Sequence, residues 1–144
     1  MTIPNTITRT LDLPHPHEKV WSAISTLEGI TSWFGQRAEG EMTPGQDVHM
    51  HWDSFDESGT LEIKVSDPMS TFAFCWGING APAEDPRRTY VEFVLVPTDS
   101  GTRLTLTESG FAQLPDEWLE QSYQGNGFGW AAELGELVEF LDAA

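Results

Sequence analysis

Two charged residues that interrupt apolar strand patterns are the first candidates for chemistry. Arg9 and Glu108 each fall on the apolar side of an alternating segment, where side chains should point toward a core. A buried charge needs a partner, so the two could form an ion pair inside or at the rim of a cavity. Such a pair would anchor a ligand or serve the fold alone, and both interpretations stay open.

Aromatic residues form the second candidate set. The chain contains six Trp and eight Phe residues, more than a small core needs for volume alone. Rings on the apolar faces of strands and of the last helix suit an apolar or aromatic ligand. Residue types do not tell whether these rings line a cavity or fill it. With the two charged residues and neighbouring positions, the candidate ligand contacts are Arg9, Trp33, Trp52, Phe72, Phe74, Trp76, Phe93, Glu108, Tyr123, Phe128, Trp130 and Leu134.

The sequence gives less support for metal binding or for catalysis than for ligand binding. His49 and His51 alternate along one strand and Asp53 follows, which are residue types that bind metals. Their face is opposite that of Val48 and Met50, so they should face solvent, and we expect no metal site. The sequence has no recognisable nucleophile triad, phosphate loop or pair of catalytic carboxylates. We therefore expect no catalytic residue and no cofactor, and we favour a protein that is not an enzyme.

Length and charge limit the remaining classes. The chain of 144 residues is predicted to form one domain, 1–144. Its formal charge of −16 would repel phosphate backbones, so we expect no nucleic-acid partner. A basic protein surface could be attracted instead.

Because no apolar run approaches the roughly 18 residues of a membrane span, we expect no membrane insertion and a soluble, cytoplasmic protein. The lone Cys75 excludes an internal disulfide.

The elements that position these residues can be read from periodicity. Alternation over residues 7–13 predicts a first strand. Residues 15–34 have helical spacing, which Gly29 interrupts, so we expect two short helices. Turn-forming residues then separate further alternating segments, which predicts an antiparallel meander. Its strands are expected near residues 48–53, 61–65, 72–78, 90–96 and 102–109.

The last segment predicts a long amphipathic helix. Pro115 and Asp116 are typical of a helix start, and Trp130 begins an apolar stripe at helical spacing. That stripe continues through Leu134, Leu137, Val138 and Leu141.

Three glycines precede this stripe, at Gly125, Gly127 and Gly129. Each costs roughly 1 kcal/mol relative to alanine inside a helix. They predict an interruption, which would be either a hinged pocket mouth beside Tyr123, Phe128 and Trp130 or a simple kink or loop.

Five segments resemble one protein family. LPHPHEKVWSAIS, TSWFG, TPGQDVHM, GTRLTLTESGF and GFGWAAELGELVEFL are similar to motifs of the START-like, helix-grip (SRPBCC) superfamily, in the branch of activators of the heat-shock-protein-90 ATPase. The resemblance implies an α+β fold in which a curved antiparallel sheet of about seven strands surrounds a long C-terminal helix. Two short helices follow the first strand. It also implies a cavity that in many members accepts a hydrophobic small molecule.

The resemblance leaves three functions open, since a fold does not determine an activity. We expect non-enzymatic binding of a hydrophobic or aromatic molecule, such as a lipid, between the sheet and the last helix. The alternative is a co-chaperone-like module that activates an ATPase and meets a basic protein surface. A further alternative is a cyclase-like or hydrolase-like enzyme, in which Glu108, Arg9 or a tyrosine moves protons. The protein could be a monomer or a dimer.

Overall fold

The computed structural model describes residues 5–78 and 84–144, apart from the side chains of residues 55 and 116–120. The first part of the loop expected between the middle strands, residues 79–83, lies outside the described residues. The elements follow one another as β1 (Thr6–Leu13), α1 (His17–Ser25), α2 (Leu27–Ile30), β2 (Arg37–Gly40), β3 (Asp47–Trp52), β4 (Glu57–Asp67), β5 (Thr71–Gly77), β6 (Arg88–Thr98), β7 (Gly101–Ser109) and α3 (Asp116–Ala143).

The strands form one antiparallel sheet in the order β1-β7-β6-β5-β4-β3-β2. Every neighbour from β2 to β7 is the next strand in sequence, which confirms the predicted meander, and β1 adds beside β7. Periodicity alone did not predict β2, because this strand has four residues and no buried one. The α+β helix-grip fold is confirmed.

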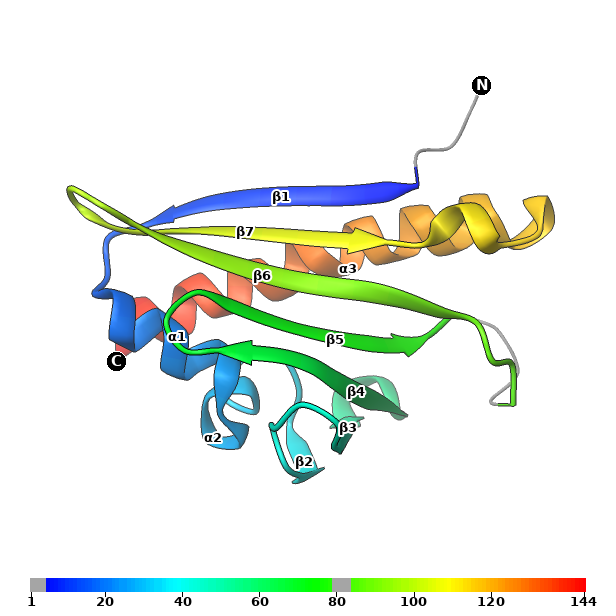
Figure 1. Cartoon of the computed structure of the whole chain (residues 1–144), viewed down its shortest axis with the longest axis horizontal. Coiled ribbons are helices and arrows are strands. Elements are labelled where there is room, and N and C mark those ends of the chain that lie inside the picture. The colour runs from blue at the N-terminus through cyan, green and yellow to red at the C-terminus, as the bar shows by residue number, and fades with distance from the viewer. Residues whose placement is uncertain (1–4, 79–83) are drawn as a thin grey trace.

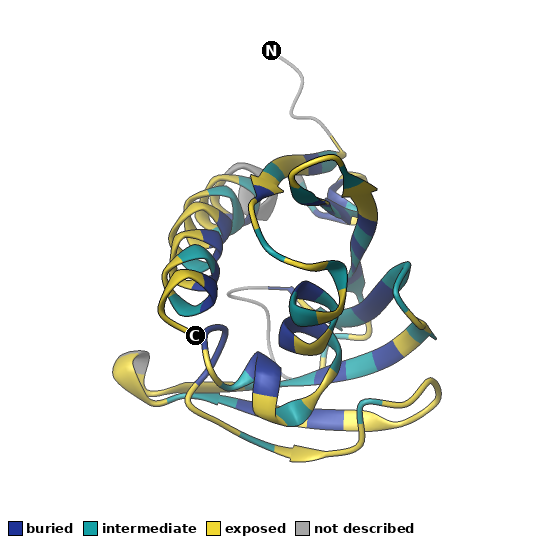
Figure 2. Ribbon diagram, turned by 90° about the vertical axis from the view of Figure 1, so that its left-hand side faces the viewer, coloured by how far each residue is buried: buried dark blue, intermediate teal, exposed yellow. Residues whose placement is uncertain are grey.

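Helix α3 runs along one face of the sheet, behind it in the view of Figure 1. Figure 2 shows the strands curving around this helix and the two short helices, with buried positions turned inward. The alternation of each strand explains this arrangement, since one side of β6 and β7 is buried at every second residue. The sheet and α3 each cover the other's apolar face.

The break between the two short helices was placed wrongly by the sequence. Gly29 lies inside α2, and the chain leaves helical geometry at Thr26 instead. The hydroxyl of Thr26 accepts a hydrogen bond from the Gly29 amide at 2.9 Å, which caps α2. A Cβ at Gly29 would lie 2.0 Å from the Ser22 carbonyl oxygen, so glycine is needed there for close packing of α2 on α1.

The predicted kink or loop at the three glycines is also wrong. Helix α3 continues without interruption from Asp116 to Ala143. A Cβ at Gly129 would meet nothing within 4 Å, and one at Gly127 would only touch Arg9, at 3.5 Å. Packing therefore does not require glycine at these two positions. The intrinsic weakness of the segment is offset by its tertiary contacts, as is common for protein helices.

Candidate functional site

The carboxylate of Glu108 lies at the centre of the site. Its residue is 0 % exposed, on the inner face of β7. The Trp76 indole of β5 donates to Oε2 at 2.8 Å, and the Trp130 indole of α3 donates to Oε1 at 2.9 Å. The Thr89 hydroxyl of β6 donates to Oε2 at 2.5 Å. Three strands and a helix thus converge on one side chain.

Asn126 supplies the remaining hydrogen bonds to this carboxylate. Its Nδ2 lies 3.0 Å from Oε1 and 3.0 Å from Oε2 of Glu108. Because a carboxylate only accepts, the amide nitrogen must face it. The four donor residues found in the described part of the chain are all neutral, so hydrogen bonds from neutral groups stabilise this buried carboxylate. Leaving such a group without partners would cost several kcal/mol, which makes the network structurally important.

Arg9 does not pair with Glu108. The predicted neighbourhood of β1 and β7 is correct, but Arg9 is registered with Leu106 and is exposed. Its Nη1 donates to the carbonyl oxygen of Thr8 at 3.0 Å. The ion pairs formed by the described residues do not include one between Arg9 and Glu108. The rule that a buried charge needs a partner is met by neutral donors instead.

Beside Glu108, the aromatic rings are in mutual contact between the sheet and α3. Phe34, which follows α2, is 3 % exposed and lies at their centre. It stacks on Trp130 with centroids 5.4 Å apart and planes at 8°. Trp52 and Trp76 of the sheet lie 5.5 and 5.8 Å from the same ring. The Trp52 indole also donates to the Phe34 carbonyl oxygen at 2.7 Å.

We call these four rings, Phe34, Trp52, Trp76 and Trp130, the ring cluster. The inner face of the sheet continues it with Phe74, which contacts Phe34 at 6.3 Å and Trp76 at 5.3 Å. Trp52 and Trp76 are only partly buried. The ring cluster is therefore accessible to solvent at Trp52 and Trp76.

Several predicted ligand contacts belong to the deeper core. Trp33, Phe72, Phe93 and Leu134 are each at most 4 % exposed. Trp33 donates its indole N–H to the Ala23 carbonyl oxygen at 2.9 Å and meets Phe93 edge to face. These contacts hold Trp33 and Phe93 in place beside the ring cluster.

Two predicted contacts lie away from the ring cluster. Phe128 is 77 % exposed, because it is two residues from Trp130 and so lies about 200° around the helix. Tyr123 packs edge to face on Phe111 at 5.3 Å, and its hydroxyl donates to the Thr6 carbonyl oxygen at 3.3 Å. The structure does not bring either residue to the ring cluster.

Sequence reasoning missed Phe34, Thr89 and Asn126, although each carried a signal. Phe34 is adjacent to Trp33, which was selected. Thr89 has the same parity as Val91 of β6, so its side chain points inward. Asn126 precedes Trp130 by four residues and shares its helix face, which becomes visible once the helix is extended through the glycines.

The paired histidines occupy the outer face of the sheet, as expected from their parity. His49 is exposed and lies 3.2 Å from the Thr60 hydroxyl, while His51 Nε2 lies 2.7 Å from Glu39 Oε2. No group of three or more His, Cys, Asp or Glu residues in the described part of the chain could hold a metal ion.

Glu133 is a second carboxyl group in an unusual setting on α3. Its Oε2 is buried and has no hydrogen-bond partner within the described structure. Burial, reinforced by the negative charge of nearby Glu136, raises the pKa of Glu133 to about 8.

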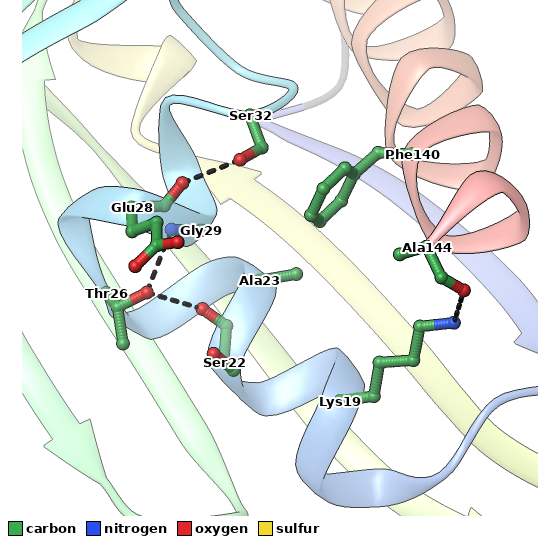
Figure 3. A pocket seen from close by; sticks show the side chains of 9 residues that line it. All are labelled: Lys19, Ser22, Ala23, Thr26, Glu28, Gly29, Ser32, Phe140 and Ala144. Atoms are coloured by element: carbon green, nitrogen blue, oxygen red, sulfur yellow. Dashed lines mark hydrogen bonds between the residues drawn. The ribbon is translucent and has the colours of Figure 1, made fainter.

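A groove of about 350 Å³ lies elsewhere, between the two short helices and the C-terminal end of α3. Figure 3 shows Phe140 facing Ala23 across it, with Lys19 below. Lys19 Nζ donates to the carbonyl oxygens of Leu141 at 2.6 Å and Ala144 at 3.2 Å, which caps the end of α3. None of the residues that line the groove belongs to the ring cluster.

Comparison with known proteins places this architecture among relatives. A family model described as "Activator of Hsp90 ATPase homolog 1-like protein" matches residues 14–142. No curated protein matches the chain. Protein MLL2253 from Mesorhizobium loti is similar in structure, with 25% identity, a TM-score of 0.81, and coverage of 96% of this chain and 98% of that chain.

Two further solved structures show the same fold. The Aha1 dimer from Colwellia psychrerythraea has 18% identity and a TM-score of 0.76, with 94% of this chain and 95% of that chain covered. DynU16, a putative protein in the dynemicin biosynthetic locus, has 21% identity and a TM-score of 0.79. That match covers 97% of this chain but 48% of DynU16, so the chain spans about half of that protein.

None of the helices within residues 5–78 and 84–144 is both long enough and apolar enough to span a bilayer.

Proposed function

The chain belongs to the family of Activator of Hsp90 ATPase homolog 1-like proteins, and on this premise we propose that it binds a hydrophobic or aromatic small molecule between the sheet and α3, without catalysing a reaction. The ligand takes the place of the Phe34 ring in the ring cluster. DynU16 supports a small-molecule partner, because that relative is associated with a biosynthetic locus.

The position of Phe34 is the observation that carries this proposal. Its ring fills a flat slot against Trp130, with planes at 8°, and is bordered by Trp52 and Trp76. Aromatic rings attract one another in offset and edge-to-face arrangements, so a planar ligand finds the same favourable surfaces. Phe34 lies in a turn outside the regular helices and strands, so displacing its ring requires no break in the hydrogen-bond ladder of the sheet.

The fluorescence of the indoles provides a direct test. We expect a panel of neutral aromatic compounds to quench it saturably in the wild-type protein. Phe34→Ala should tighten this binding, because the side chain no longer competes for the slot and an apolar void accepts an apolar guest. Phe72→Ala removes an equally buried phenyl ring outside the ring cluster and is the matched control, with wild-type affinity expected.

The absence of saturable quenching in the wild-type protein would contradict the proposal. If Phe34→Ala and Phe72→Ala increased the affinity for the aromatic compounds equally, binding would have to occur outside the slot. Native mass spectrometry of the protein from its own cells would then identify the retained molecule.

An ATPase-activating interaction is the second candidate function, favoured by the family description and by the charge of −16. An acidic surface would meet a basic surface of the chaperone, and raising the salt concentration would weaken that contact. The measurement is ATP hydrolysis by Hsp90 with and without this protein at two ionic strengths. An unchanged rate at low salt would reject this candidate.

A further inference from the structure

We infer that the ligand carries a protonated amino group, which replaces the amide of Asn126 as a donor to Glu108. The inference rests on the proposed function, because the ligand must first occupy the space beside the ring cluster. It adds a chemical class to that proposal, namely an aromatic ring joined by a short linker to an ammonium group.

The first argument is the charge of the site. Glu108 is 0 % exposed, and its donors are two indoles, a hydroxyl and an amide, all neutral. Neutral donors satisfy the oxygen lone pairs but leave the negative charge uncompensated inside the protein. Hydrogen bonds between an ammonium and a carboxylate are shorter and stronger than those from a neutral amide. A cationic ligand would therefore gain more from this site than a neutral one.

The second argument is the geometry of Asn126. Its nitrogen is equidistant from the two carboxylate oxygens, at 3.0 Å from each. An ammonium that shares its protons between both oxygens would occupy the same position. Asn126 is partly exposed, whereas Thr89 and Trp130 are 1 % and 2 % exposed. The amide is therefore accessible to a solvent-borne group, as is the partly exposed indole of Trp76.

The third argument is the backbone around Asn126. Gly125 and Gly127 flank it on α3, so this turn of the helix has the lowest intrinsic helix propensity. The side chain can withdraw when the turn opens locally, without unfolding of the remaining helix. Asn126 would then act as a plug that holds the donor position until an amine arrives.

The fourth argument is the closeness of the carboxylate to the ring slot. Trp76 and Trp130 both donate to Glu108, and both contact the Phe34 ring, at 5.8 and 5.4 Å between centroids. The same two indoles thus border the slot and hold the carboxylate. A ring in the slot can carry an amino group to Glu108 through a short alkyl linker. The charge of −16 also raises the local concentration of a cation.

The experiment compares two probes that share a ring and a linker, 2-phenylethylamine and 2-phenylethanol. Binding is measured by indole fluorescence at pH 7 in the full chain. We expect the amine to bind at least about tenfold more tightly than the alcohol. The preference should disappear in Glu108→Gln, and Asn126→Ala should strengthen amine binding because the plug is removed. Glu62→Gln, on the partly exposed outer side of β4, should keep the wild-type preference.

A nuclear magnetic resonance measurement on the wild-type protein tests the inference even if the Glu108→Gln variant does not fold. The side-chain amide signals of Asn126 in the wild-type protein should shift with saturating amine and stay unchanged with the alcohol. Equal affinities of the two probes would overturn the inference and leave the proposed function standing. Failure of both probes, with no other aromatic compound bound, would overturn both. Weaker amine binding by Asn126→Ala would also overturn the role of Asn126.

Discussion

The two halves of α3 are attached to the sheet by different forces. Residues 121–129 include three glycines, and their main described contacts are the hydrogen bonds of Asn126 to Glu108 and the edge-to-face packing of Tyr123 on Phe111. Residues 130–143 use an apolar stripe in which Leu137 and Leu141 are 0 % exposed. Lys19 further caps the C-terminal end. Among the described side chains of this continuous helix, those of residues 130–143 are therefore packed by an apolar stripe, whereas those of residues 121–129 include few apolar contacts.

This difference shows how a single helix can serve stability and binding together. Apolar burial is spread over many contacts and does not depend on one atom. A polar attachment can be exchanged for an equivalent donor, such as one from a ligand. The packed half keeps α3 in place while the other half responds, and the low-stability segment lies beside the candidate site, as is typical of binding regions.

The largest expected effect on stability comes from removing buried apolar groups in the packed residues 130–143 of α3. Leu137→Ala should lower the free energy of unfolding by about 2–5 kcal/mol, because it removes buried methyl groups and leaves a cavity. Urea denaturation measures this loss. Phe128→Ala is the control in the other half, and because its ring is 77 % exposed it should change stability by less than about 0.5 kcal/mol. Similar losses in the two variants would contradict the comparison.

A smaller effect is expected when the polar attachment is disturbed. Glu108→Gln places an amide among four donor residues, so at least one buried N–H loses its acceptor. We expect a loss of about 1–3 kcal/mol in the free energy of unfolding by urea. Glu139→Gln, on the exposed side of the packed half, should be neutral. A Glu108→Gln protein as stable as the wild type would show that the network does not hold the helix.

The glycines allow the contrast to be sharpened. Gly129→Ala and Gly135→Ala should each stabilise the protein by about 0.5–1 kcal/mol, since a Cβ at either position meets nothing within 4 Å. The two variants should differ in hydrogen exchange. In the wild type, the amides of residues 123–129 should exchange faster than those of residues 134–141. Gly129→Ala should strongly slow exchange of the amides of residues 123–129, whereas Gly135→Ala should not. Uniformly slow exchange along α3 would remove the proposed opening.

The smallest effect concerns pH. Burial raises the pKa of Glu133 to about 8 in the folded protein, from its ordinary value of 4.5. The folded state therefore binds this proton more tightly than the unfolded state, and stability falls as pH rises between these values. Glu133→Gln should remove that part of the pH dependence, with a gain below about 1 kcal/mol at pH 8 for a group that is partly solvated. Identical melting curves from pH 5 to pH 8 in both proteins would contradict this.

Much of the fold was predictable because its signals are local. Alternation along β6 and β7 and the apolar stripe from Trp130 onward placed the sheet and the packed half of α3 correctly. Strand β2 was missed from periodicity because a short exposed edge strand buries too little to leave a pattern. The glycines were misjudged because helix propensity is a weak guide where tertiary contacts compensate for it.

The site was predictable only in part. Parity correctly placed Glu108 and Trp76 on the inner face, but it could not show which donors reach the carboxylate. Those donors come from β5, β6 and α3, so their meeting depends on strand register and on the rotation of the helix. The exposure of Arg9 could not be read from parity either, because its register partner Leu106 is fully buried on the same face of the sheet. Such distances arise from tertiary structure and leave no local signature.

The pairing of β1 with β7 has a consequence for how the protein is made. Thr6 is registered with Ser109, and Leu13 with Thr102, so the first strand finds its neighbour only after the two short helices and β2 to β6 have been synthesised. Until then its edge and apolar face remain available to other chains in the cell. Contacts of such long sequence separation slow folding and prolong that exposure. Slower translation of the segment between β1 and β7 should therefore prolong this exposure and lower the yield of native protein.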